Sequence, residues 1–290
     1  MKFLLTGACG LVGTAIRRAC EGVHEIVSVD TSGDVASISG VQANVTDLDA
    51  MKRAALDCDA IIHTAAMHGG HLKNASHQEF IQTNVAGAEN LFEAAREHGI
   101  RRLVMSSTLD ILCGIDWSAS GITVYDDCTP PRPDTIYSVT KLMAEELGHF
   151  YARQHGLEVI QLRYVYVRGI PMQKIGLGLL ARSIADSDVA QANVLAATTP
   201  GLKDHVFLIG PETPLDLKDV MQALSEPWAV LERHWPGCRQ VLEAHDLAPR
   251  ASNFWPVCRI DQARRFLGWE PKVTFERFLK QLGWEPGRGS

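Results

Sequence analysis

A glycine-rich turn near the N-terminus constrains the fold of this chain more than any other segment. Residues 6–13 read Thr-Gly-Ala-Cys-Gly-Leu-Val-Gly and directly follow the apolar run 3–5. The pattern predicts a strand, a tight turn at Gly7 and a helix, with Gly10 open to an approaching pyrophosphate and Gly13 packed against the strand. Free N–H groups at the start of such a helix attract phosphate. The predicted dinucleotide site includes Gly7, Cys9, Gly10, Leu11 and Val12.

The sequence Glu-Ile-Val-Ser-Val-Asp over 25–30 predicts a second strand that ends in an acidic residue, Asp30. A carboxylate at this place accepts hydrogen bonds from the adenosine ribose hydroxyls and repels a 2′-phosphate. The neighbouring Thr31 and Ser32 carry no positive charge that would compensate. The pattern therefore favours NAD over NADP as the cofactor.

Composition narrows the class of protein. Hydrophobic residues make up 46% of the 290 residues and charged residues 21%, which is the balance of a soluble globular protein. The formal charge of −6 and the lack of a long basic run argue against nucleic acid as a partner, and no apolar run has the length of a membrane span. The seven cysteines are scattered and form no C-x-x-C pair. We therefore expect reduced thiols and a cytoplasmic location.

Strand and helix patterns alternate through the first half of the chain. Strands are expected over 3–5, 25–30, 41–45, 59–64, 102–106, 157–162 and 205–209. Helices are expected over 11–21, 47–56, 76–98, 136–155, 216–224, 260–267 and 274–282. The Pro- and Trp-containing stretch 226–256 is predicted to be mostly loop.

Repeated strand–helix units of this kind predict a parallel sheet with helices on both faces. The fold class is therefore α/β, a Rossmann-type doubly wound parallel sheet with a small C-terminal substrate lobe. Residues 1–165 are expected to form the NAD-binding domain, with later segments returning to the sheet. Residues 166–290 are expected to form mainly the substrate-binding lobe.

The pair Tyr137 and Lys141 is the strongest catalytic signal. Their spacing places both side chains on one face of the helix expected over 136–155. A phenol titrates near pH 10 in water, too high for a base at neutral pH, but a neighbouring ammonium favours the phenolate. The pair therefore predicts a tuned acid/base. The alternative is an exposed Tyr and Lys on an amphipathic helix, which the preceding dinucleotide turn disfavours.

A hydroxyl donor is also needed to polarise the reacting C–O bond. Residues 104–108 read Val-Met-Ser-Ser-Thr at the carboxyl end of an expected strand, the edge at which open parallel sheets bind ligands. Ser107 is the first choice and Thr108 the second. The alternative is that small hydroxyl residues merely end the strand.

These features together resemble an extended short-chain dehydrogenase/reductase of the NAD-dependent epimerase/dehydratase family. The resemblance runs nearly from end to end of the chain. Its motifs are the turn at 6–13, Asp30, His-Thr-Ala-Ala at 63–66, the helix motif at 84–95, Ser106-Ser107, Tyr137 with Lys141, Leu162-Arg163 and Leu-Gly-Trp-Glu-Pro at 267–271.

The resemblance implies further cofactor contacts and an assembly. Ala65 and Ala66 would pass close to the cofactor, Asn44 and Val45 would lie near the adenine, and Asn84 would order the active-site helix. Family members usually carry Asp where Asn44 stands. The helices expected over 76–98 and 136–155 commonly form a four-helix interface in this family, so a homodimer is expected.

Two departures bear on the substrate. Tyr166 replaces an Asn, and Arg168 a Tyr, of the motif usual in sugar-nucleotide members. The insertion that usually follows is short here, which resembles uronate dehydrogenases acting on free sugar acids. Arg168 or Lys174 would then pair with a substrate carboxylate, the alternative for each being ordinary surface charge. The other expected substrate residues are Met67, His68, Ser107 and Tyr164.

Two other chemistries are disfavoured. His68 and His71 lie in the segment 67–73 with no Cys or carboxylate at ligand spacing, so we expect a loop over the substrate and no metal. Dehydratase members place Asp-Glu directly after the catalytic hydroxyl, and the sequence Thr-Leu-Asp over 108–110 does not reproduce that pair.

The expected function is an NAD-dependent oxidoreductase that transfers hydride at a secondary alcohol of a small, sugar-like substrate. One alternative is a nucleotide-sugar epimerase, in which the hydride returns to the other face of the substrate. An alternative of another class is a non-catalytic NAD-binding regulator, and the Tyr137–Lys141 pair counts against it.

Overall fold

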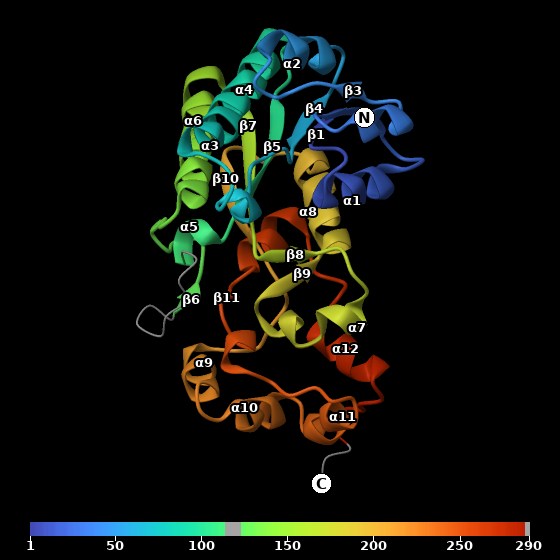
Figure 1. Cartoon of the computed structure of the whole chain (residues 1–290), viewed down its shortest axis with the longest axis vertical. Helices are drawn as coiled ribbons and strands as arrows, with labels where there is room; N and C mark the ends of the chain where they lie inside the picture. The colour runs from blue at the N-terminus through green and yellow to red at the C-terminus, as the bar shows by residue number, and fades with distance from the viewer. Residues whose placement is uncertain (114–122, 288–290) are drawn as a thin grey trace.

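A seven-stranded parallel sheet forms the centre of the computed structural model, which describes residues 1–113 and 123–287 (Figure 1). Its strands are β1 (Lys2–Thr6), β2 (Glu25–Asp30), β3 (Val41–Gln42), β4 (Ala60–His63), β5 (Arg102–Thr108), β7 (Glu158–Tyr164) and β10 (His205–Ile209). Their order is β10-β7-β5-β4-β1-β2-β3, and every neighbouring pair is parallel. The order reverses between β1 and β4, which is where such sheets bind ligands.

Helices cover both faces of the sheet, as the doubly wound prediction requires (Figure 1). One face carries α1 (Leu11–Cys20) and α8 (Asp186–Thr198), and the other carries α2 (Leu48–Ala55), α4 (Gly87–Glu97) and α6 (Ile136–His155). Alternate strand residues divide between the two layers, because successive side chains of a strand point to opposite faces. Phe3 and Leu5 enter the core under α1 and α8, whereas Leu4 enters the core under α2, α4 and α6.

The helix that carries the Tyr137–Lys141 pair has the predicted bounds. Thr135 caps its first turn by accepting a hydrogen bond from the Ser138 N–H, and Gly156 ends it in the left-handed region at φ +68°. The helix expected over 76–98 is instead interrupted. It consists of α3 (His77–Ile81), a π-helical turn η3 (Gln82–Ala86) and α4. Such turns are frequent at functional sites.

The C-terminal lobe lies below the sheet in Figure 1. Its elements are β8 (Tyr166–Arg168), α7 (Met172–Ile175), η5 (Gly176–Leu180), β9 (Ser183–Ala185), α9 (Leu217–Ala223), α10 (Pro227–His234), α11 (Cys238–Ala244), η6 (Ala251–Asn253), β11 (Val257–Cys258), η7 (Ala263–Leu267) and α12 (Phe275–Gln281). The remaining short elements of the described ranges are η1 (Gly33–Ile38), η2 (Gly69–His71), α5 (Asp110–Cys113) and β6 (Val124–Tyr125). Between β9 and α9 the chain returns to the sheet as α8 and β10.

The prediction of mostly loop over 226–256 is wrong, because α10 and α11 occupy much of this stretch. Pro227 stands in the first turn of α10, where its missing N–H costs no hydrogen bond. Trp235 packs edge-on against Phe275 with ring centroids 4.8 Å apart. Tertiary packing of this kind stabilises helices that are too short to form alone.

In the two described ranges, no helix combines the length and the apolar character needed to cross a bilayer.

Candidate active site

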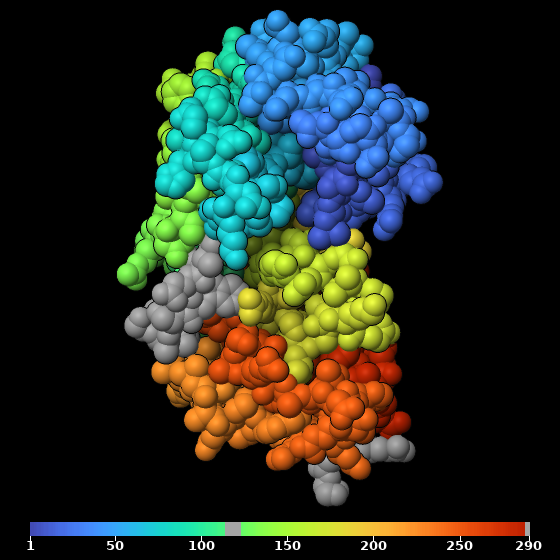
Figure 2. All heavy atoms as spheres, viewed as in Figure 1, coloured from blue at the N-terminus to red at the C-terminus, as the bar shows by residue number. Residues whose placement is uncertain are grey.

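A cavity of about 1570 Å³ opens beside the carboxyl ends of β1, β4 and β5. Figure 2 shows the surface hollowed between the blue N-terminal segments and the cyan segments, above the yellow-green part of the C-terminal lobe. Nearly all the expected site residues line this cavity. They are Gly7, Cys9, Gly10, Leu11, Val12, Asp30, Asn44, Val45, Ala65, Ala66, Met67, His68, Ser107, Thr108, Tyr137, Lys141 and Tyr164.

The glycine turn has the geometry of a phosphate cradle. Gly7 has φ +71°, and a Cβ there would lie 2.7 Å from the Ala65 nitrogen. A Cβ at Gly13 would lie 2.1 Å from the Gly7 oxygen. Gly10 begins α1 without a side-chain cap, and no acidic residue stands in the first turn. The backbone N–H groups at the start of α1 are therefore left for an anion in the cavity.

The Asp30 carboxylate is fixed at the end of β2. Its Oδ2 accepts a hydrogen bond from the Cys9 N–H at 2.8 Å, and its Oδ1 accepts one from the Ser32 N–H at 2.9 Å. Each carboxylate oxygen has further acceptor capacity for a ribose hydroxyl. These contacts join the acidic residue to the glycine turn.

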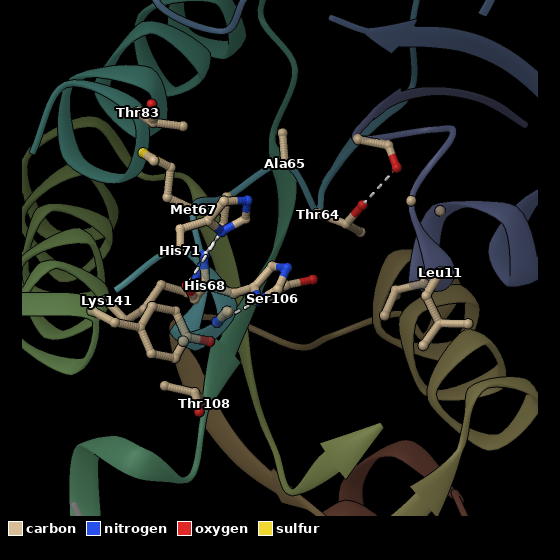
Figure 3. Close-up of a pocket in the computed structure, with 18 of the residues that line it drawn as sticks. Leu11, Thr64, Ala65, Met67, His68, His71, Thr83, Ser106, Thr108 and Lys141 are labelled. Carbon is tan, nitrogen blue, oxygen red and sulfur yellow. Dashed lines mark hydrogen bonds between the residues drawn. The ribbon is translucent and has the colours of Figure 1, made fainter. Parts of the chain in front are cut away.

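Tyr137 and Lys141 reach the cavity from the first turns of α6. Figure 3 shows Lys141 and Thr108 on one side of the cavity and Leu11 of α1 across it. Burial lowers the pKa of the Lys141 ammonium to about 8, with Glu145 opposing the shift. The pKa of the Tyr137 phenol is raised, chiefly by burial and then by the negative charge of Asp110, while a hydrogen bond with Thr108 acts against the rise.

The pKa of the Tyr137 phenol is therefore raised in the protein without cofactor, whereas the sequence predicted that Lys141 would lower it. Taking an ionisable side chain out of water disfavours its charged form, and burial is the largest cause of the raised phenol pKa. An additional positive charge in the cavity would be needed to favour the phenolate.

The two candidate hydroxyls of β5 have different partners. The Ser107 hydroxyl donates to Glu145 Oε1 at 2.5 Å, and Arg163 holds the same carboxylate through Nε and Nη2 at 3.0 and 2.6 Å. Thr108, on the alternate face of the strand, hydrogen-bonds the Tyr137 phenol. Geometry therefore favours Thr108, the second choice, over Ser107 as the hydroxyl that polarises a substrate.

Asn84 holds the loop over the cavity without lining it. Its Oδ1 accepts from the Met67 N–H at 2.8 Å, and its Nδ2 donates to the Met67 carbonyl at 2.9 Å and to Thr140 Oγ1 at 3.0 Å. The π-helical turn η3 thus joins the loop to α6. The ordering role expected for Asn84 stays a prediction.

The two loop histidines hold the loop itself together. His68 Nδ1 accepts a hydrogen bond from the Gly70 N–H at 3.1 Å, and His71 Nδ1 accepts one from the His68 N–H at 3.0 Å. Among the residues that the structure describes, no three His, Cys, Asp or Glu side chains are grouped to hold a metal ion.

Two expected substrate residues lie outside the cavity wall. The Arg168 guanidinium stacks on the exposed Tyr166 ring, 4.2 Å from its centroid, and Lys174 is exposed on α7. The lobe instead contributes Arg182, which directly precedes β9, and the strand-end segment contributes Asp110. The position of Asp110 just after the strand hydroxyls is a signal that sequence reasoning passed over, whereas Arg182 has no such motif.

A comparison with known families decides the class of the chain. The model of the NAD dependent epimerase/dehydratase family matches residues 3–195. The chain belongs to this family. The predicted resemblance is thereby confirmed, and NAD is the family's cofactor. The glycine cradle, the uncapped start of α1 and the anchored Asp30 carboxylate all fit that cofactor.

The chain is similar to several characterised proteins. A uronate dehydrogenase of Pseudomonas putida is 27% identical over 214 residues, covering 72% of this chain and 75% of that protein. An L-arabinose 1-dehydrogenase (NAD(P)(+)) of Haloferax volcanii is 31% identical over 175 residues, covering 56% and 65%. A crystal structure of UDP-glucose 4-epimerase from Thermotoga maritima with UDP-glucose superposes with a TM-score of 0.70 at 22% identity, covering 97% and 96%.

The anchored carboxylate predicts how the cofactor preference can be changed. Replacing Asp30 with Asn should weaken NADH binding about tenfold and narrow the preference over NADPH, because a charged acceptor is worth roughly 1.5–3 kcal/mol and its repulsion of the 2′-phosphate disappears. Calorimetric titration with both nucleotides measures this. Asp49→Asn, at an exposed position on α2, is the control. An Asp30→Asn variant with an unaltered ratio of NADH affinity to NADPH affinity would contradict the assignment of Asp30 to the adenosine ribose.

Proposed function

We propose that the chain is an NAD-dependent dehydrogenase that oxidises a secondary alcohol of a small free sugar or sugar acid. The convergence of Tyr137, Lys141 and Thr108 on the cavity at the sheet's switch point carries this proposal. The similarity to a uronate dehydrogenase and an L-arabinose dehydrogenase supports the substrate class. We also propose that residues 1–165 mainly hold the cofactor and residues 166–290 mainly the substrate.

The side chains divide the chemistry between them. Thr108 and Tyr137 hold the oxygen of the reacting alcohol, and Tyr137 accepts its proton. Lys141, buried beside the cavity, stabilises the negative charge that the Tyr137 phenolate carries before it takes up this proton, and would donate hydrogen bonds to the nicotinamide ribose. NAD, when bound, supplies the hydride acceptor and a positively charged ring. Burial of Tyr137 keeps its proton in place until that positive charge is present.

A nucleotide-sugar epimerase is the alternative enzyme. Its support is the fold shared with UDP-glucose 4-epimerase. The short connection from β8 to β9, residues 169–182, leaves little chain to surround a nucleotide diphosphate. A product analysis separates the two, because an epimerase forms no net NADH. A non-catalytic NAD-binding role is disfavoured by the pairing of Tyr137 and Lys141 at the cavity wall.

The proposed roles of the hydroxyls give a matched set of variants. Tyr137→Phe should lower kcat by about 10²–10⁴-fold with NADH affinity nearly unchanged, because only the proton acceptor is lost. Thr108→Ala should lower kcat about 10²-fold for loss of a donor to the reacting oxygen. Initial rates of NADH formation over a panel of sugars and sugar acids measure both.

The control for this set is Ser107→Ala. It removes a donor to a buried carboxylate and should cost about 1–3 kcal/mol of unfolding free energy with a much smaller loss of kcat. A full-rate Tyr137→Phe enzyme would reject the proposed base. A larger kcat loss in Ser107→Ala than in Thr108→Ala would return the polarising role to Ser107.

Arg182 supports a sugar acid as substrate, in place of the expected Arg168 or Lys174. Arg182→Gln should raise KM for a hexuronate about 10-fold to 100-fold, because the charge-assisted hydrogen bonds to the carboxylate are lost. KM for a neutral aldose should change little. Arg168→Gln, outside the cavity, is the matched control. An equal rise in KM for the hexuronate and for the aldose would contradict the pairing of Arg182 with a substrate carboxylate.

We further propose a homodimer that associates through α6. Val139, Met143 and Phe150 on this helix are 36%, 42% and 45% exposed, and their spacing places them along one face. Met143→Glu combined with Phe150→Glu should shift the chain from dimer to monomer mass in light scattering. A monomeric unmodified chain would contradict the interface. A cytoplasmic location is proposed because all seven cysteines are free thiols.

A further inference from the structure

Asp110 is a cavity-lining acid that the proposed chemistry does not use. It begins α5, two positions after Thr108, the last residue of β5. Its backbone N–H donates to Thr108 Oγ1 at 3.2 Å. The residue is therefore held beside the hydroxyl that contacts the Tyr137 phenol, at the end of the cavity where the reacting carbon must bind.

Three titratable groups of the described residues interact electrostatically with this carboxylate. The Tyr137 phenol faces it from α6, Asp134 from the segment before α6, and the Cys113 thiol from α5 itself. Burial raises the pKa of Asp110 to about 6, and Asp134 adds to the rise, while a hydrogen bond with Thr108 opposes it. At neutral pH the carboxylate is ionised, and its charge raises the pKa of the phenol.

The negative charge of Asp110 works against the proposed catalysis, because it raises the pKa of the phenol that must accept a proton. Without a compensating role, its placement here would lower the catalytic rate. It is useful if the substrate supplies a partner. An ionised carboxylate forms short, strong hydrogen bonds with hydroxyl groups. It repels a second carboxylate placed at the same distance.

We propose that Asp110 determines substrate specificity by accepting a hydrogen bond from a hydroxyl on a carbon next to the reacting carbon. The inference rests on the proposed dehydrogenase function. An ionised Asp110 in this role favours binding of polyhydroxylated substrates and excludes 2-hydroxy acids, whose carboxylate would lie against it. A sugar acid then binds in one direction, with its hydroxyl-bearing end at Asp110 and its carboxylate toward Arg182 on the lobe's wall of the cavity.

The proposed role of Asp110 and a purely structural role predict opposite changes in stability when Asp110 is replaced by Asn. The folded-state pKa of about 6 lies above the ordinary 3.8, so the folded chain binds more protons between these values than the unfolded chain. Unfolding free energy contributed by this group therefore falls as pH rises from about 4 to 6 and stays lower above that. Asp110→Asn should remove this cost and raise Tm at pH 8, whereas loss of a structural acid would lower Tm.

The experiment compares the unmodified enzyme with Asp110→Asn and Asp134→Asn. Asp134→Asn is the matched control, because it removes a neighbouring negative charge from an exposed position outside the cavity wall. Each enzyme is assayed from pH 5 to 8 with a neutral aldose, a hexuronate and a 2-hydroxy acid. Binding of the aldose to the NADH complex is measured by calorimetry.

Asp110→Asn should raise both KM and the calorimetric Kd for the aldose about 10-fold to 100-fold, with a smaller change in kcat. In the unmodified enzyme KM should rise as pH falls below about 6, because protonation removes the charged acceptor. That rise should be absent in Asp110→Asn and retained in Asp134→Asn. In Asp110→Asn, the enzyme's activity with the 2-hydroxy acid should rise relative to its activity with the aldose.

Failure of this inference is distinguishable from failure of the proposed function. An active enzyme whose aldose KM and Kd are unmoved by Asp110→Asn, or whose Asp110→Asn variant has a lower Tm at pH 8, overturns the role of Asp110 alone. An unmodified enzyme that binds NADH but neither binds nor oxidises any sugar overturns the proposed function, and the role of Asp110 with it.

Discussion

The buried Glu145 carboxylate fixes the geometry on which the site depends. It is 1% exposed and accepts hydrogen bonds from Ser107 of β5 and Arg163 of β7, while its backbone oxygen accepts one from Gln161. These bonds hold α6 against two strands. Lys141 lies one turn before Glu145 on the same helix, so its position above the strand ends follows directly. Removing one member of such a buried pair typically costs about 3–5 kcal/mol.

The cavity retains several charged or titratable groups in surroundings that oppose their charge. Lys141 and Asp110 on the cavity wall, and the buried His63 at the end of β4, all have pKa values shifted by burial toward their neutral forms, His63 to about 3. His63 binds Thr6 across β4 and β1 through a 2.7 Å hydrogen bond, at the switch point itself. A stable core would avoid such groups, whereas a site that must move a proton and bind polar ligands needs them.

Sequence patterns within single segments predicted those helices and strands whose bounds are set by the segment's own residues. The bounds of β2, α6 and β10 follow from periodicity and capping, and the glycine turn follows from what its backbone must approach. The choice between Ser107 and Thr108 could not be predicted in this way, because it depends on a contact distant in sequence, the hydrogen bond that occupies Ser107 with Glu145. The π-helical turn at Asn84 was missed for a similar reason: its stabilising contacts, to Met67 and Thr140, are distant in sequence.

The side of the cavity formed by the C-terminal lobe could be predicted least, because its residues meet only through tertiary packing. Arg168 ends β8 and Arg182 directly precedes β9, and only the folded chain shows which of them lines the cavity. The position of this ladder is set from two sides. A Cβ at Gly169 would lie 2.1 Å from Leu11 of α1, so the lobe touches the helix that begins at the phosphate turn.

The second side is α8. Asp188, buried within α8, accepts hydrogen bonds from the Lys272 and Val273 N–H groups at 2.7 and 2.9 Å, and Trp269 donates to its carbonyl at 2.9 Å. The C-terminal segment is thereby bound to the helix that packs on α1. One helical layer, α1 with α8, thus contacts both the glycine turn and the C-terminal lobe. The α1–α8 contact therefore connects the end of the cavity formed by the glycine turn to the end to which the lobe contributes Arg182.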